Sequence, residues 1–135
     1  MKPEFRGRPG DTILTSTPNN PTRHLWIILA ITDNGKLLSV NLMDSENTHE
    51  NTVILNKGDH PFVSKPTAIK FSAARELDPQ KIQDAISNGM VIPHFPISPE
   101  LLEEAKRGFL ASPYFPESLK RKLRLSGNLP PQGDY

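Results

Sequence analysis

Histidines are the side chains of this sequence best suited to proton transfer, because an ordinary pKa of about 6.5 populates both protonation states at neutral pH. Four are present, and no two have the three- or four-residue spacing that places two zinc ligands on one helix face. Cysteines, phosphate-binding glycine loops and nucleophile-elbow serines are also absent from the sequence. We therefore expect acid-base chemistry without a metal or cofactor. The histidines at 49 and 94 lie in polar or proline-flanked stretches and are expected to be ordinary loop residues.

Residues 19 to 26 bring a cation and an imidazole to the beginning of an apolar strand. Arg23 and His24 follow a turn-rich stretch and come directly before Leu25. Rigid neighbours hold a side chain at such a strand end while leaving it within reach of solvent. Arg23 and His24 are therefore candidate catalytic residues. The alternative for His24 is hydrogen bonding within its own turn.

Residues 56 to 62 form a second constrained segment. Gly58 permits a tight turn, and Pro61 fixes the direction in which the chain leaves it. Lys57 and His60 project from this loop, so His60 is a candidate catalytic residue and Lys57 a candidate substrate-binding residue. The alternative for His60 is a hydrogen bond within its own turn or to Asp59.

The composition is that of one folded domain. The chain has 135 residues, of which 36% are hydrophobic and 23% charged. Its 16 basic against 15 acidic residues give a net charge of +1, so overall charge alone predicts no nucleic-acid partner. The longest apolar run, Leu25–Ile31, is far shorter than the roughly 20 residues of a membrane span. Because the lack of cysteine also fits a reducing compartment, we expect a cytoplasmic protein without membrane contact.

The first half of the chain is typical of short strands, because β-branched and aliphatic residues dominate each apolar run. Asn34-Gly35 is the pair that most readily takes positive φ at both centres of a type I′ turn, so it predicts a hairpin. The run around Trp26 is apolar throughout, which predicts a strand buried on both faces with Trp26 in the core. The predicted strands are Thr12–Thr17, Leu25–Ile31, Lys36–Leu42, Thr52–Leu55 and Thr67–Phe71.

Helix signals begin at residue 78. Asp78-Pro79 and Ser98-Pro99 each combine a capping residue with a first-turn proline, and Gly89 can end the first of these helices. A third helix is expected from about Pro116. Isolated helices of this length are marginal in water, so we expect them to pack on the strands.

Four stretches, in order along residues 10 to 72, resemble the MazF/PemK-like toxin family. They are Gly10–Leu14, the arginine-led strand Arg23–Ala30, the strand Val40–Leu42 after the hairpin, and the late strand Thr67–Phe71. The resemblance implies an SH3-like barrel, usually dimeric, that cleaves single-stranded RNA without metal and is neutralised by an antitoxin polypeptide.

With this resemblance we predict a mainly β fold, a small SH3-like β-barrel wrapped by about three short C-terminal helices. The barrel is expected over residues 1–76 and a helical extension of the same domain over 77–125. Residues 126–135 offer little to bury and are expected to be a mobile tail.

Carried over by position, the resemblance makes Arg23 the phosphate-binding catalytic arginine. Met43 stands where the family has a threonine or serine, and a thioether cannot do that work. Asp44 and Ser45, the next two residues, are the expected replacements. They are candidate substrate-binding residues, together with Trp26.

Metal-free RNA cleavage needs three groups: a base for the ribose 2′-hydroxyl proton, a cation for the charge that develops at phosphorus, and an acid for the leaving 5′-oxygen. His60, Arg23 and His24 are the candidates for these roles. The first functional hypothesis is therefore a toxin-like, metal-independent endoribonuclease. Its expected partners are single-stranded RNA, an antitoxin and a second copy of the chain.

The alternative is a non-catalytic SH3-like interaction module whose groove binds a partner peptide. Trp26, Phe62 and the C-terminal helices would form its contact surface. The two hypotheses differ in geometry, because an enzyme must bring Arg23, His24 and His60 into one concave site, whereas a binding module has no need to.

Overall fold

The computed structural model describes residues 3–17, 20–114 and 117–125, so the predicted tail at 126–135 lies outside the described residues. No helix in these three ranges is long and apolar enough to cross a membrane. In chain order the elements are β1 (Thr12–Thr17), β2 (Asn20–Ile31), β3 (Leu37–Asp44), the 3₁₀ helix η1 (Ser45–Asn47), β4 (Ile54–Leu55), β5 (Thr67–Leu77), α1 (Pro79–Ser87), β6 (Ile92–His94), α2 (Pro99–Ala111) and α3 (Glu117–Leu125).

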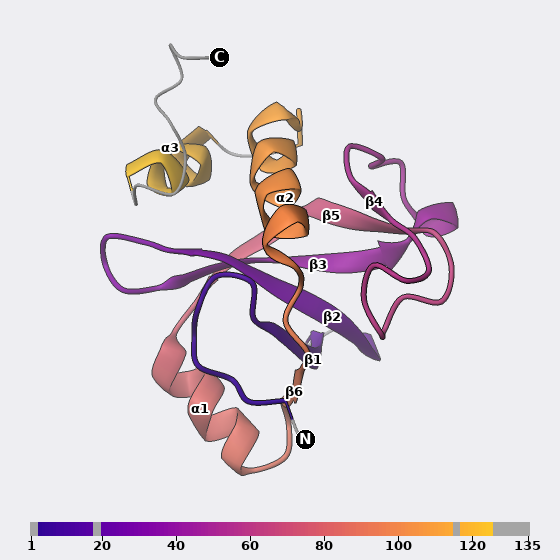
Figure 1. Ribbon diagram of the computed structural model, residues 1–135. Helices are drawn as coiled ribbons and strands as arrows, with labels where there is room; N and C mark the ends of the chain where they lie inside the picture. Colours follow the sequence, from indigo (N-terminus) through magenta and orange to yellow (C-terminus); the bar gives the residue numbers. More distant parts are fainter. Residues whose placement is uncertain (1–2, 18–19, 115–116, 126–135) are drawn as a thin grey trace.

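The six strands form one antiparallel sheet in the order β4-β5-β3-β2-β1-β6. The sheet is curled, with α2 on one side and α1 on the other (Figure 1). Because β4 and β6 are unpaired edges, the curled sheet is a half-barrel. The predicted mainly β fold, a small barrel with three short helices around it, is confirmed in this form.

Both faces of the sheet are buried because the central strand β2 is apolar at successive positions, which point to alternate faces. Leu25 and Ile27 belong to the larger core, which Phe109 of α2 completes. Trp26 and Ile28 belong to a smaller core, against which α1 packs. The prediction that Trp26 is a core residue is confirmed, since only 3% of it is exposed.

The β2–β3 hairpin lies where it was predicted, but its turn is of another type. Gly35 has a φ of 77°, and no non-glycine residue in the described part of the chain has a positive φ. The Gly35 N–H donates to the Thr32 carbonyl at 2.9 Å, and the Thr32 N–H donates to the Lys36 carbonyl at 2.8 Å. These bonds define a type I turn followed by a left-handed glycine. The type I′ prediction was wrong because the loop has three residues, so only Gly35 needs a positive φ.

β6 is a strand that the sequence pattern did not predict. It has three residues, and its middle residue Pro93 pairs with Ile13 of β1. β6 returns the chain to the sheet after α1, so the segment 77–125 contributes a strand as well as helices. A short run with a central proline carries little strand signal of its own. Pairing with β1 defines this strand.

α2 packs closely on the larger core because Gly108 has no side chain. A Cβ at Gly108 would lie 2.4 Å from Val53 Cγ2 and 2.9 Å from Phe71 Cζ. The helix begins as predicted, with the Ser98 hydroxyl accepting the Leu101 N–H at 3.1 Å. The close approach holds α2 across the larger core, against Val53 just before β4 and Phe71 of β5.

Candidate functional site

The loop after β4 folds into the constrained turn that its sequence predicts. Gly58 has a φ of 103°, a conformation that other residues rarely adopt. The Asp59 carboxylate accepts the Asn56 N–H at 2.7 Å, and the Asp59 N–H donates to the Asn56 carbonyl at 3.0 Å. These bonds fix the turn and direct His60 inward, while Lys57 is exposed.

His60 is buried, with only 3% of its surface exposed, and both of its ring nitrogens are hydrogen bonded. Nδ1 accepts the Phe62 N–H at 3.0 Å, which leaves Nε2 to donate to the Phe95 carbonyl at 2.5 Å. Burial lowers the pKa of His60, so the neutral imidazole is favoured. In this arrangement His60 has no nitrogen available for substrate. The geometry fits the structural alternative and does not favour its candidate role as a catalytic base.

Four rings meet at this point, and we call them the aromatic cluster: His60, Phe62, His94 and Phe95. The His94 centroid lies 4.9 Å from that of His60, 6.1 Å from Phe62 and 5.7 Å from Phe95. The two phenylalanines are 40% and 43% exposed, respectively. The cluster therefore presents two apolar rings to solvent, and the buried His60 holds their segments together.

His94 and Phe95 are the residues of this cluster that sequence reasoning missed. The clearest case is His94, which was expected to be an ordinary loop residue. Its Nδ1 accepts the Phe95 N–H at 2.9 Å, and no residue in the described ranges bonds its Nε2. Partial burial lowers the pKa of His94. A signal was present, because the pairs His60-Pro61 and Pro93-His94 each precede a phenylalanine. Their 34-residue separation hid the contact.

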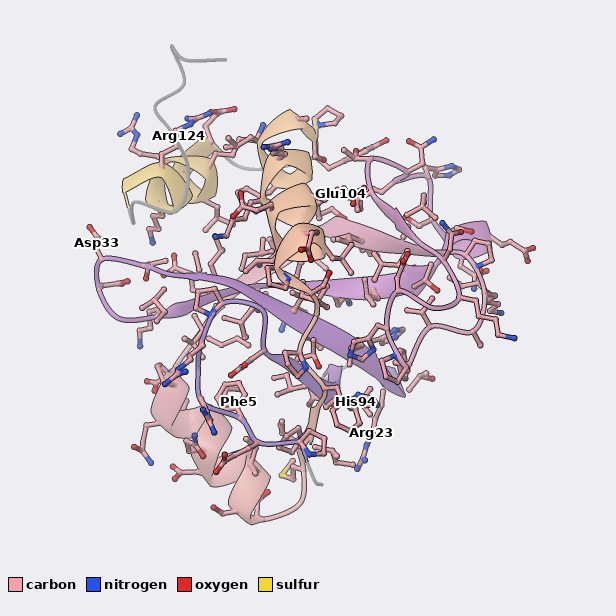
Figure 2. The ribbon with its side chains drawn as sticks, in the orientation of Figure 1. Phe5, Arg23, Asp33, His94, Glu104 and Arg124 are labelled. Carbon is pink, nitrogen blue, oxygen red and sulfur yellow. The ribbon has the colours of Figure 1, made fainter. Side chains whose placement is uncertain are left out.

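Arg23 and His24 do not join this cluster as one site. They are consecutive on β2, so their side chains point to opposite faces of the sheet. Figure 2 shows Arg23 and His94 in the same lower part of the molecule. The strand register separates their Cα atoms by two strands and four residues, about 16 Å at the usual spacings. Extended side chains of both residues are therefore needed to contact one phosphate across this distance.

The residues expected to replace the missing threonine or serine are engaged in local structure. Asp44 caps η1, accepting the Glu46 N–H at 3.1 Å, and pairs with Lys65 at 2.5 Å. The Lys65 ammonium lowers the pKa of Asp44, which holds the carboxylate in its charged form. The Ser45 N–H donates to the Pro66 carbonyl at 3.2 Å. Through this ion pair and this hydrogen bond, both residues hold the end of β3 against the segment before β5.

Comparison with protein-family models, curated proteins and solved structures finds no match to this chain. The resemblance to the toxin family therefore stays a prediction. Within the described ranges, no three side chains of the histidine, aspartate or glutamate type gather to hold a metal ion. Arg23 and His24 point to opposite faces of β2, His60 is buried, and the aromatic cluster presents the exposed rings of Phe62 and Phe95.

Proposed function

We propose that this protein is a non-catalytic interaction module, and that a partner polypeptide docks on the aromatic cluster. The observation that carries the proposal is the exposure of Phe62 and Phe95 on a rigid base. Aromatic side chains are enriched at the centres of protein interfaces, and a large side chain already held in place loses little entropy on binding.

The surface beside the cluster supports a polypeptide partner. Ile92 is 40% exposed and Met90 is 68% exposed, and both precede Phe95 along the same edge segment. Exposed apolar residues that gather on one segment are typical of a docking surface. Pro93 has no N–H to donate, so β6 cannot offer a continuous ladder for an added strand. The partner would therefore bind mainly through side chains.

The separation of the candidate catalytic residues supports binding over catalysis. His60 uses both ring nitrogens inside the protein. Arg23 and His24 face opposite sides of β2. A binding module has no need of their convergence, whereas cleavage requires an acid, a base and a cation at one phosphate.

Site-specific photocrosslinking in the cells that produce the protein tests this proposal. A photoreactive phenylalanine analogue at position 95 should give a discrete adduct, and Phe62→Asp in the same chain should abolish it. The analogue at Glu104, exposed on α2, is the matched control and should give none. An adduct with a second copy of the chain would identify a homodimer. Equal adducts from both positions, or none from 95, would contradict the proposal.

A toxin-like endoribonuclease is the second candidate, because His94 Nε2, which no described residue bonds, lies beside two exposed rings. Aromatic rings are platforms for bases of single-stranded RNA, and an imidazole nitrogen can transfer a proton at neutral pH. In an endoribonuclease of this kind, His94 takes the proton-transfer role first assigned to His60, and Arg23 binds phosphate. An antitoxin covers the aromatic cluster. This candidate requires extended side chains of Arg23 and His94 to contact the same phosphodiester.

A further inference from the structure

A row of three side chains crosses the sheet on the face that carries the smaller core. Trp26 of β2 pairs with Asn41 of β3, and Asn41 pairs with Lys70 of β5. Directly paired residues of an antiparallel ladder stand on the same face, with Cβ atoms about 5 Å apart. The three side chains are therefore immediate neighbours. By strand alternation, this is the face opposite to that of His94.

Two buried polar atoms in this row have no hydrogen-bond partner in the described part of the chain. Trp26 is 3% exposed and Asn41 is 5% exposed, and neither Trp26 Nε1 nor Asn41 Oδ1 is bonded by any described residue. More than nine in ten buried polar groups in native proteins are paired, because an unpaired group loses its water without compensation. Two such atoms on paired neighbours point to a binding partner that supplies an acceptor and a donor.

Arg75 adds a positive charge above the row. Its guanidinium carbon lies 5.9 Å from the centroid of the Trp26 ring. Four residues of β5 lie between Lys70 and Arg75, where β3 has only Val40 between the residues they pair with. Because of this bulge, Arg75 pairs with Ser39 of β3, and its guanidinium lies over the Trp26 ring. The Glu50 carboxylate fastens the bulge by accepting the Ser72 N–H at 3.0 Å.

The two cations have no acidic partner among the described residues. Neither Lys70 nor Arg75 forms an ion pair with any residue in the described part of the chain. The carboxylates of the neighbouring strands are engaged elsewhere: Glu76 pairs with Lys122, and Asp44 pairs with Lys65. This part of the sheet face therefore favours an anion.

The donors and acceptors of the row restrict the chemistry of that anion. The indole N–H only donates, so it requires an acceptor such as a carboxylate oxygen. Asn41 Oδ1 requires a donor such as an amide N–H. A bridging water could bond both atoms but would leave Arg75 and Lys70 without a counter-charge, whereas a carboxylate beside an amide N–H supplies the acceptor, the donor and the charge together.

We propose that Trp26, Asn41, Arg75 and Lys70 form a binding site for a carboxylate with an amide N–H beside it. A polypeptide C-terminus and a free N-acylated amino acid share this chemistry. Arg75 is exposed and Lys70 is half-buried, so both long side chains can move aside to admit the ligand and then pair with it. The site is independent of the aromatic cluster and of the partner proposed to dock there.

Trp26 is the single tryptophan of the chain, so its fluorescence reports on this site. The probes are N-acetylglycine, an acetylated hexapeptide with a free C-terminal carboxylate, and the same peptide with a C-terminal carboxamide. We expect a saturable change in emission with the free acids. The carboxamide should bind at least about tenfold more weakly, because it loses charge-assisted hydrogen bonds. If the peptide acid binds more strongly than N-acetylglycine, the ligand is a polypeptide C-terminus. If the two acids bind equally well, the ligand is a free N-acylated amino acid.

Variants separate the site from general effects on the fold. Arg75→Gln should weaken binding of the acid about tenfold, while Arg107→Gln, an exposed arginine on α2, should leave it unchanged. Asn41→Leu should abolish binding without lowering the thermal midpoint, because it removes an unpaired buried group. No saturable change with either acid, equal binding of the carboxamide, or full binding by Arg75→Gln would overturn the proposal.

Discussion

The His60 side chain donates Nε2–H to the carbonyl oxygen of Phe95, 35 residues further along the chain, at 2.5 Å. His60 follows edge strand β4, and Phe95 follows the opposite edge strand β6. The same carbonyl accepts the Thr12 hydroxyl of β1 at 2.7 Å. A side-chain hydrogen bond thus joins the segments that leave the two edges of the half-barrel, where a closed barrel would have strand pairing.

Replacement of His60 tests this connection. His60→Ala leaves the Phe62 N–H without its partner and opens a cavity, so the free energy of unfolding should fall by about 1 to 3 kcal/mol. Urea unfolding at neutral pH measures the change. His49→Ala, at an exposed loop position, is the control and should cost almost nothing. Equal stabilities of the two variants would show that His60 does not hold the loop.

Stability should fall as the solution is acidified below about pH 6.5. Burial lowers the pKa of both His60 and His94 in the folded state, so the unfolded chain takes up protons first as the pH decreases. The full stabilisation is present above the unfolded pKa and is lost between that value and the lower folded pKa. Unfolding free energies between pH 7.5 and 5 should show this loss, and His60→Ala should reduce it. A free energy of unfolding that does not change between pH 7.5 and 5 in the wild type would contradict the lowered pKa values of the two histidines.

The packing of α2 can be tested at Phe109. The ring is fully buried and lies 6.2 Å from the Phe71 ring of β5, centroid to centroid. Phe109→Ala should lower the free energy of unfolding by about 3 to 5 kcal/mol. Glu104→Ala, on the exposed side of the helix, is the control. An unchanged unfolding midpoint in Phe109→Ala would mean that α2 is a detachable arm.

Gly108 provides an independent test of the same contact. An added Cβ would overlap the Val53 and Phe71 side chains, so Gly108→Ala should destabilise the protein by about 1 to 3 kcal/mol despite the better helix propensity of alanine. Thermal unfolding compares it with Ser118→Ala, an exposed position in α3. Stabilisation by Gly108→Ala would show that α2 lies farther from the sheet.

Local signals were sufficient for most of the fold. The apolar run around Trp26 predicts a buried strand because both of its faces need apolar neighbours, and Ser98-Pro99 predicts a helix start from capping alone. β6 could not be predicted in this way, because its three residues acquire strand geometry only by pairing with β1. The hairpin was located by Asn34-Gly35, but the loop length decided its turn type.

The candidate site was less predictable because its contacts are distant in sequence. His60 was recognised as unusual from its constrained loop, but its partners Phe95 and His94 belong to a segment without a local signal. Arg23 and His24 appeared equivalent as neighbours in sequence, yet strand alternation sends them to opposite faces. The register of β2 with β3 brings Trp26 and Asn41, with their two unpaired polar atoms, side by side, and composition does not reveal this register.

An assay for RNA cleavage distinguishes a binding module from an endoribonuclease. Purified protein is incubated with mixed single-stranded RNA in the presence of a metal chelator, alongside Arg23→Ala and His94→Ala, and the 2′,3′-cyclic phosphate ends are counted. A binding module leaves the RNA intact, so we expect no cleavage in any of the three samples. Chelator-resistant cleavage by the wild type that is lost in both variants, with their unfolding midpoints unchanged, would contradict the binding module and establish the endoribonuclease.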